Sequence, residues 1–249
     1  MTDRAPRRWP APAGIQAILG VQIAIAGTLF AGDILRVLPR AALSPDAPGL
    51  TQPVRPGDQT RRYDRRRAPA GPGAPDTADL PSRLLFEADG DALRLTGVIA
   101  AGDAGRFDDW RASRTLPSRV ELHSTGGSVP DALAIGRTLR AAGAETIVAG
   151  GKVCLSACPY ILAGGTDRRV DADAYIGVHQ HYFGKNTALP AFLAVEDIQR
   201  GQGEVMAYLD EMGVDPRMMQ HALVTPPEDI YILVPEELER YALATEITR

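Results

Sequence analysis

The chain has 249 residues, a formal net charge of −4 and an apolar fraction of 45%. This length suits one well-buried domain with additional segments, and the apolar fraction is ordinary for a globular protein. The slightly acidic balance argues against nucleic-acid binding. Two cysteines are too few for a disulfide-built scaffold, and they lack the second ligand pair of a zinc site. We therefore expect neither a metal nor a cofactor.

The first part of the chain, residues 1–38, is predicted to be an N-terminal tail and a transmembrane anchor. After a basic start that includes Arg8, no charged residue occurs until Asp33. A helix of about 20 mostly apolar residues can cross the hydrocarbon core, and this run reaches that length. The basic flank favours a cytoplasmic N-terminus, with the remainder exported to the periplasm. A signal peptide cleaved near 24–26 (AIA) is the competing interpretation. Because the apolar run continues to Phe30, the uncleaved anchor is favoured.

Residues 39–81 are rich in Pro, Gly, Arg and Asp and show no apolar periodicity. Such a segment cannot bury enough apolar surface to offset its ordering entropy, so we expect a disordered linker. It contains the basic stretch 61–67 (RRYDRRR). A patch for anionic lipid or a partner is one interpretation of this stretch, and a solvated charge run in a tether is the favoured one.

Residues 82–249 have a globular pattern and the size of one catalytic domain. The sequence predicts strands and helices in alternation, which implies parallel pairing, right-handed crossovers and the α/β class. Apolar spacing, capping residues and glycine stops delimit these elements. The expected strands are 92–99, 119–123, 146–149 and 174–180, and the expected helices are 128–142, a short one ending near 162, 195–212 and 235–242.

Two strand-to-helix junctions carry residues suited to acyl transfer. At such a junction the helix start presents unpaired backbone N–H groups that favour developing negative charge. Gly126 and Gly127 lie at the first junction and permit close approach of a substrate carbonyl. Ser156 lies at the second and is followed by the small Ala157. A hydroxyl nucleophile beside the N–H groups of Gly127 and Ala157 would form the parts of an oxyanion-stabilised site.

A serine hydroxyl needs a base and an orienting group. The domain has four histidines, His123, His179, His181 and His221, and several aspartates. Spacing alone does not choose between these histidines. The order of the motifs along the chain supplies the further information that this choice requires.

Four segments in this order resemble the proteolytic subunit of the Clp protease. They are 120–140 (VELHSTGGSVPDALAIGRTLR), 151–165 (GKVCLSACPYILAGG), 174–182 (AYIGVHQHY) and 228–245 (EDIYILVPEELERYALAT). They resemble, respectively, that family's glycine-rich segment, its nucleophile segment, its catalytic-histidine segment and its last segment. The resemblance covers most of residues 93–245, and the motifs are specific when taken together.

The resemblance implies a Clp-protease/crotonase-like fold of repeated ββα units and peptide-bond hydrolysis. Ser156 would be the nucleophile, His179 the base and Asp229 the group that holds the imidazole. The oxyanion hole would come from Gly126, Gly127 and Ala157. Such folds commonly assemble, so we also expect a homo-oligomer that acts on a peptide or protein substrate.

The sequence departs from that family at several points. Thr125 stands where the family usually has proline, and His123 stands where it usually has asparagine. An exported domain would not meet a cytosolic ATP-driven unfoldase, so ATP-independent hydrolysis is expected. The function predicted is that of a membrane-anchored exported serine hydrolase, and we expect it to be a peptidase. The alternatives are a crotonase-fold enzyme acting on acyl-CoA and a catalytically silent binding scaffold.

Three local alternatives accompany this assignment. His181 shares a strand face with His179 and is the main rival base. Lys152 could form a Ser–Lys dyad, but no motif supports it. Cys154 and Cys158 could form a disulfide that braces the Ser156 turn in an oxidising compartment. Two small buried thiols are an equally weighted interpretation of that pair.

Overall fold

The computed structural model describes residues 11–42, 60–62, 77, 79–181 and 191–248. The chain divides into two compact units, Met1–Asp46 and Ala47–Arg249. The predicted segmentation into 1–38, 39–81 and 82–249 stays a prediction.

The first unit contains one long helix, α1 (Ala11–Ala42). It forms where the sequence predicts an anchor, and apolar side chains such as Ile18 and Ile23 are exposed along it. Within the described residues, no helix meets the length and hydropathy needed to cross a membrane. The polar Gln16 and Gln22 interrupt the apolar run. The expected transmembrane helix is therefore not supported.

The second unit contains a six-stranded sheet that is parallel except at one edge. Its strand order is β10 (Glu246–Thr248), β7 (Arg168–Asp171), β5 (Glu145–Val148), β4 (Arg119–His123), β3 (Ala92–Thr96) and β2 (Leu85–Asp89). Only β2 and β3 pair antiparallel, as a hairpin. The parallel pairing confirms the expected α/β class, because parallel neighbours need crossover connections.

A four-stranded sheet contains the strand that ends at the Ser156 junction. Its order is β1 (Thr60–Arg62), β9 (Asp229–Leu233), β8 (Tyr175–Val178) and β6 (Val153–Leu155). Strand β6 runs parallel to β8, and β9 runs antiparallel to both β8 and β1. Strand β1 lies inside the segment expected to be a linker, so the backbone there adds an edge strand to β9.

The chain passes from one sheet to the other in repeated units. Strand β5 joins the large sheet, β6 joins the small sheet, and α4 (Cys158–Ala163) follows. Strands β7 and β8 repeat this alternation, and α5 (Ala191–Glu211) comes next in the chain. Each unit therefore delivers one strand end to the small sheet. This arrangement brings β6 and β8 side by side, although 19 residues lie between Leu155 and Tyr175 in the sequence.

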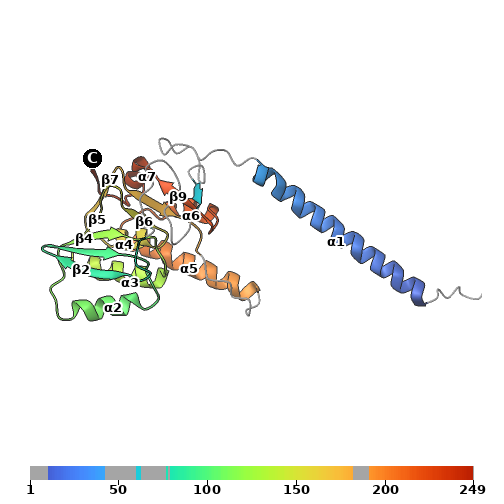
Figure 1. Ribbon diagram of the computed structural model, residues 1–249, viewed down its shortest axis with the longest axis horizontal. Helices are drawn as coiled ribbons and strands as arrows, with labels where there is room; N and C mark the ends of the chain where they lie inside the picture. The colour runs from blue at the N-terminus through green and yellow to red at the C-terminus, as the bar shows by residue number, and fades with distance from the viewer. Residues whose placement is uncertain (1–10, 43–59, 63–76, 78, 182–190, 249) are drawn as a thin grey trace, which may run out of the picture. The chain divides into compact units, whose positions relative to one another are not determined.

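Helices α2 (Asp103–Arg111) and α3 (Val129–Ala141) contact each other, and α3 also contacts α4. Figure 1 shows α2 and α3 together below the strands of the large sheet. Phe107 of α2 is fully buried, with its ring 5.4 Å from that of Phe86 on β2. The remaining elements are a 3-10 turn (Pro216–Met218), α6 (Met219–Val224) and α7 (Pro235–Arg240).

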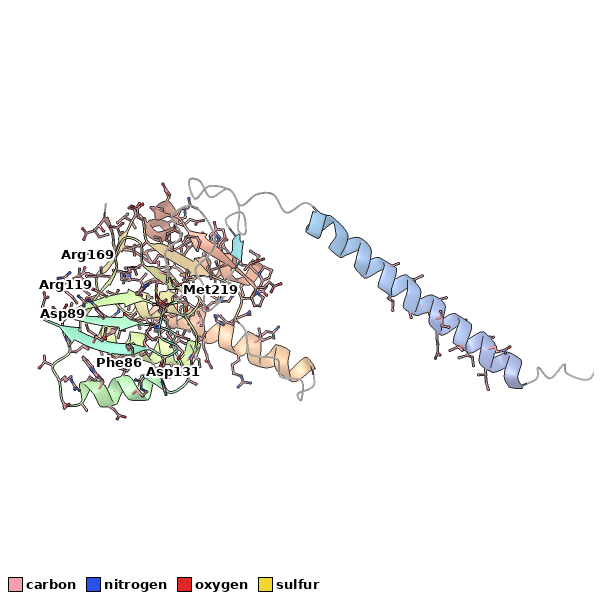
Figure 2. The ribbon with its side chains drawn as sticks, in the orientation of Figure 1. Phe86, Asp89, Arg119, Asp131, Arg169 and Met219 are labelled. Carbon is pink, nitrogen blue, oxygen red and sulfur yellow. A yellow bond between two sulfur atoms is a disulfide. The ribbon has the colours of Figure 1, made fainter. Side chains whose placement is uncertain are left out.

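Ion pairs cross the strands of the large sheet on its exposed side. Arg119 lies 3.5 Å from Asp91, and Arg169 lies 2.9 Å from Glu145 and 2.8 Å from Glu246. Figure 2 shows Asp89, Arg119 and Arg169 on one side of the unit, away from Asp131 and Met219. Because these pairs are partly exposed, each contributes at most about 1 kcal/mol. The polar groups that matter for the site lie elsewhere.

The start of α3 differs from the sequence-based expectation. Ser128 occupies the N-cap position, but its side chain makes no capping hydrogen bond to the helix backbone. Its hydroxyl donates instead to Asp131, in the first turn of α3. The preceding residues, Gly126 and Gly127, have φ of 92° and 145°, in the region that favours glycine.

Candidate active site

Ser156 lies in the tight turn between β6 and α4. Its φ is 60°, a left-handed value that is uncommon for a residue with a side chain. The Ser156 N–H donates to the carbonyl of Gly177 on β8 at 2.8 Å, which fixes the turn against the neighbouring strand. Strained residues of this kind cluster at functional sites because the surrounding structure must hold them. The turn directs the hydroxyl toward the residue that follows β8.

That residue is His179, which is buried and hydrogen-bonded on both ring nitrogens. Its Nε2 lies 2.7 Å from the Ser156 Oγ, and its Nδ1 lies 3.0 Å from the carbonyl oxygen of Pro227. Because a carbonyl only accepts, Nδ1 carries the proton and Nε2 is left as the acceptor of the serine hydroxyl proton. The pair therefore has the tautomer and the distance that a nucleophile and its base require.

The loop that carries the Pro227 carbonyl is fixed at its start by Thr225, which is fully buried. The Thr225 hydroxyl donates to the carbonyl of His221 at 2.7 Å. The carbonyl of Thr225 accepts the N–H of Gln180 at 2.9 Å, so the residue after His179 is held by the same loop. Both the imidazole and its acceptor are thus held by one segment.

Asp229, the orienting residue expected from the resemblance, begins β9 two residues beyond Pro227. Its N–H donates to the carbonyl of Pro226 at 3.0 Å, and it pairs in register with Arg62 of β1. The hydrogen bond that the structure shows for the His179 Nδ1 goes to the Pro227 carbonyl. The role of Asp229 therefore stays a prediction.

The two junctions meet at the nucleophile. A Cβ built on Gly126 would lie 2.5 Å from the Ser156 Cβ and 2.8 Å from the Ala157 nitrogen, so this glycine packs directly against the turn. Within the described part of the chain, the N–H groups of Gly127 and Ala157 donate to no protein acceptor. Two free backbone donors beside a serine hydroxyl are the components of an oxyanion hole.

Cys154 and Cys158 form a disulfide that encloses Ser156. The bond joins β6 to the first residue of α4, with the two Cα atoms 5.0 Å apart, and both residues are fully buried. The sequence left a bridge and two free thiols as equal interpretations, and the structure has the bridge. A short covalent loop of this kind restricts the backbone that holds the nucleophile in its left-handed conformation.

Replacing both cysteines by serine is expected to lower the free energy of unfolding by about 2 kcal/mol, from the entropy of the short loop that the bond closes. Urea denaturation of the oxidised protein and of the double variant measures the difference. Dithiothreitol should shift the oxidised protein to the same midpoint and leave the variant unchanged. Equal midpoints for all samples would contradict a bridge that constrains this turn.

The other three histidines have different surroundings. His123 accepts the N–H of Val153 through Nδ1 at 3.3 Å, and burial, together with the charge of Lys152, lowers its pKa. The His181 Nε2 lies 2.9 Å from the hydroxyl of Tyr160, and burial lowers the His181 pKa as well. The Ser156 hydroxyl is bonded to the ring of His179.

His221 belongs to a separate buried cluster. Its Nε2 lies 2.9 Å from the Tyr241 hydroxyl, and its ring stacks on Tyr231 with centroids 4.3 Å apart. Burial, with repulsion from Arg240, lowers the pKa of His221 to about 4. This histidine therefore stays neutral at physiological pH. Its carbonyl accepts the hydroxyl of Thr225, which gives His221 a structural role at the start of the loop.

Sequence reasoning did not find the Pro227 carbonyl, because a main-chain acceptor leaves no side-chain signature. The two consecutive prolines, Pro226 and Pro227, restrict the backbone there.

No group of three or more His, Cys, Asp or Glu residues in the described ranges is arranged to hold a metal ion.

The structure is similar to chains of known solved structures. No protein-family description matches the sequence, and no curated protein matches it. The structure is similar to that of a ClpP1 mutant from Listeria monocytogenes, with 16% sequence identity and a TM-score of 0.41. The similarity covers 53% of this chain and 72% of that one.

Proposed function

We propose that the chain is a serine hydrolase that cleaves peptide or related acyl bonds through Ser156 and His179. The observation that carries the proposal is the 2.7 Å contact between the serine Oγ and the imidazole Nε2. It is supported by the neutral tautomer that the Pro227 carbonyl selects and by the two free N–H groups of Gly127 and Ala157.

In the proposed reaction, the Ser156 Oγ bonds to the substrate carbonyl carbon while its proton passes to the His179 Nε2. The carbonyl π electrons move onto oxygen, and the N–H groups of Gly127 and Ala157 stabilise that charge. The carbon–nitrogen bond then breaks, and His179 gives its proton to the leaving amine. Water enters, loses a proton to Nε2 and attacks the acyl carbon, and the serine oxygen leaves with that proton.

The buried disulfide between Cys154 and Cys158 supports an oxidising compartment for this domain, since such bonds persist outside the reducing cytosol. We therefore include export in the proposal. A catalytic domain in that compartment has no access to an ATP-driven unfoldase, so hydrolysis would be ATP-independent. An acyl-CoA substrate fits this compartment poorly.

Labelling with a fluorescent fluorophosphonate tests the proposal. The full-length chain should react, and Ser156→Ala should lose labelling by at least about 10³-fold, because the nucleophile is gone. Ser113→Ala is the matched control, since Ser113 is exposed in the turn after α2 and should label like the parent chain. Equal labelling of the parent and Ser156→Ala would overturn the proposal, and so would a folded parent that does not react.

A further inference from the structure

The oxyanion turn, residues 126–128, is fixed by two backbone hydrogen bonds to one residue of the neighbouring chain segment. The Ile99 N–H donates to the carbonyl of Gly126 at 2.9 Å, and the Ser128 N–H donates to the carbonyl of Ile99 at 2.7 Å. These bonds flank Gly127 on both sides. A Cβ at Gly127 would lie 2.0 Å from the Ile99 oxygen, so the two segments are in tight contact. The direction of the Gly127 N–H therefore depends on where Ile99 is held.

Asp103 holds the segment that follows Ile99. Its carboxylate is fully buried at the start of α2 and accepts the N–H of Ala100 at 2.8 Å. The same carboxylate receives Arg83 Nε and Arg106 Nη1, each at 2.7 Å. Burial alone would raise the pKa of Asp103, but these charged hydrogen bonds outweigh it and lower the pKa. Asp103 thus fixes the backbone beside Ile99 through its hydrogen bond to Ala100.

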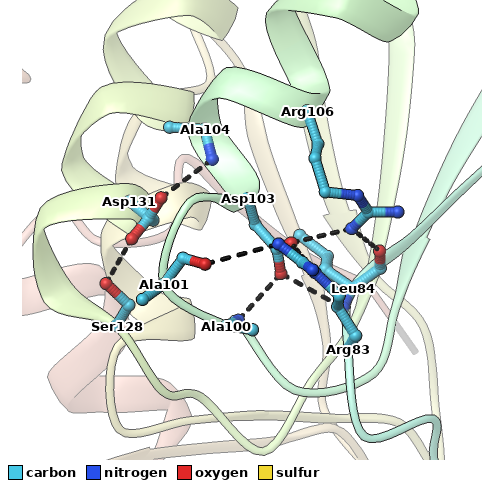
Figure 3. A network of polar contacts seen from close by, with 9 residues as sticks. All are labelled: Arg83, Leu84, Ala100, Ala101, Asp103, Ala104, Arg106, Ser128 and Asp131. Carbon is cyan, nitrogen blue, oxygen red and sulfur yellow. Dashed lines mark hydrogen bonds and ion pairs between the residues drawn. The ribbon is translucent and has the colours of Figure 1, made fainter.

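Asp131 holds the other side of the turn. Its Oδ2 accepts the hydroxyl of Ser128, and its Oδ1 accepts the N–H of Ala104 at 2.9 Å. Ala104 follows Asp103 in α2, so the backbone of these two residues links the contacts of one carboxylate to those of the other. Figure 3 shows Asp131 between Ser128 and Ala104, with Asp103 between Ala100 and the two arginines.

These contacts close a ring. It runs from Ile99 and Ala100 through Asp103 to Ala104, then through Asp131 to Ser128, and back to Ile99. Since charge-assisted hydrogen bonds are stronger than neutral ones, the two carboxylates make the ring stiff. Gly127 is bonded into the ring on either side, and its neighbour Gly126 packs directly against the Ser156 turn.

We propose that Asp131, acting through Ser128, is a positioning residue that aligns the Gly127 N–H for the oxyanion, in the ring that Asp103 anchors. The inference rests on the proposed hydrolase function. A misplacement of about 1 Å in such a group costs roughly 10²-fold in rate. Asp131 contacts neither the nucleophile nor its base, so its loss should affect the rate of the chemical step and leave substrate binding largely unchanged.

The test uses steady-state hydrolysis of p-nitrophenyl butyrate by the full-length chain. Asp131→Ala should lower kcat by roughly 10- to 100-fold with KM within about twofold, because the donor is misaligned and not removed. Ser128→Ala should lower kcat in the same direction, and the double variant should be no worse than the poorer single one, because both act through one contact. Asp131→Asn keeps an acceptor oxygen and a polar partner for Ser128. It should therefore retain most of the kcat of the parent chain.

Asp108→Ala is the control, since Asp108 is an exposed carboxylate on α2, the helix that Asp131 contacts through Ala104, and pairs with Arg111. A parent chain that labels at Ser156 while Asp131→Ala and Ser128→Ala retain full kcat would overturn the positioning role and leave the proposed function intact. Additive losses in the double variant would also overturn it. If Asp131→Ala fails to fold, Ser128→Ala carries the test alone. A folded parent that neither labels nor turns over would overturn both proposals together.

Discussion

Replacing His179 by alanine is expected to lower the turnover of an activated ester by roughly 10³- to 10⁴-fold, because the Ser156 hydroxyl then has no base. The imidazole is already at 2.7 Å from the serine oxygen and carries its proton on the far nitrogen. Its removal abolishes the acceptor without disturbing the oxyanion turn. The measurement is kcat for the parent and the variant, with thermal unfolding to verify that both are folded.

His181→Ala is the informative comparison, since His181 lies two residues further on and has Tyr160 as a ring partner. It should retain turnover within about tenfold of the parent, a loss that reflects local packing around a buried residue. The reverse pattern, with His179→Ala active and His181→Ala inactive, would assign the base to the rival histidine and refute the account given above.

Replacing Gly127 by alanine should lower kcat by about 10²- to 10³-fold, comparable to the loss of an oxyanion donor. The added Cβ would lie 2.0 Å from the Ile99 carbonyl oxygen, which is backbone and cannot rotate away. The φ of 145° is also unfavourable for a residue with a side chain. The turn must therefore separate from Ile99, and the Gly127 N–H moves with it. Steady-state hydrolysis of p-nitrophenyl butyrate measures the effect.

Gly143→Ala separates backbone strain from misalignment at the site. Gly143 ends α3 with a φ of 67° and has no atom within 4 Å of the position where a Cβ would be. This variant should lose about 1 kcal/mol of stability, as expected for a side chain in the left-handed region, and keep kcat. A Gly127→Ala protein with full kcat would show that its N–H is not an oxyanion donor.

The strongly patterned elements could be predicted from sequence. Strand β4 has the bounds expected from 119–123, because alternating apolar residues and the following glycines define both of its ends. Helix α3 (Val129–Ala141) is one residue shorter at each end than the expected 128–142, because Ser128 and Ala142 occupy its cap positions. Gly143 follows the C-cap, as a helix stop should. Ser156 and His179, the nucleophile and base that the resemblance implies, are 2.7 Å apart, and their catalytic roles stay a prediction.

Elements with little apolar signal were missed. Strand β7 reads RRVD, yet it lies between β5 and β10. Arg168 is buried there because its guanidinium donates to the carbonyls of Gly165 and Ala242, which no local pattern encodes. The sequence also did not predict the role of the Pro227 carbonyl or the hydrogen bond between Ser128 and Asp131, for a related reason. A hydrogen bond between distant or backbone atoms depends on the tertiary fold, and helix-capping statistics favoured a different role for Ser128.

The most direct measurement is the crystal structure of the full-length chain after reaction with diisopropyl fluorophosphate. We expect the phosphorus bonded to the Ser156 Oγ, with one phosphoryl oxygen within hydrogen-bonding distance of the Gly127 and Ala157 N–H groups and His179 beside the adduct. An adduct on another residue, or one at Ser156 whose phosphoryl oxygen points away from both N–H groups, would contradict the account.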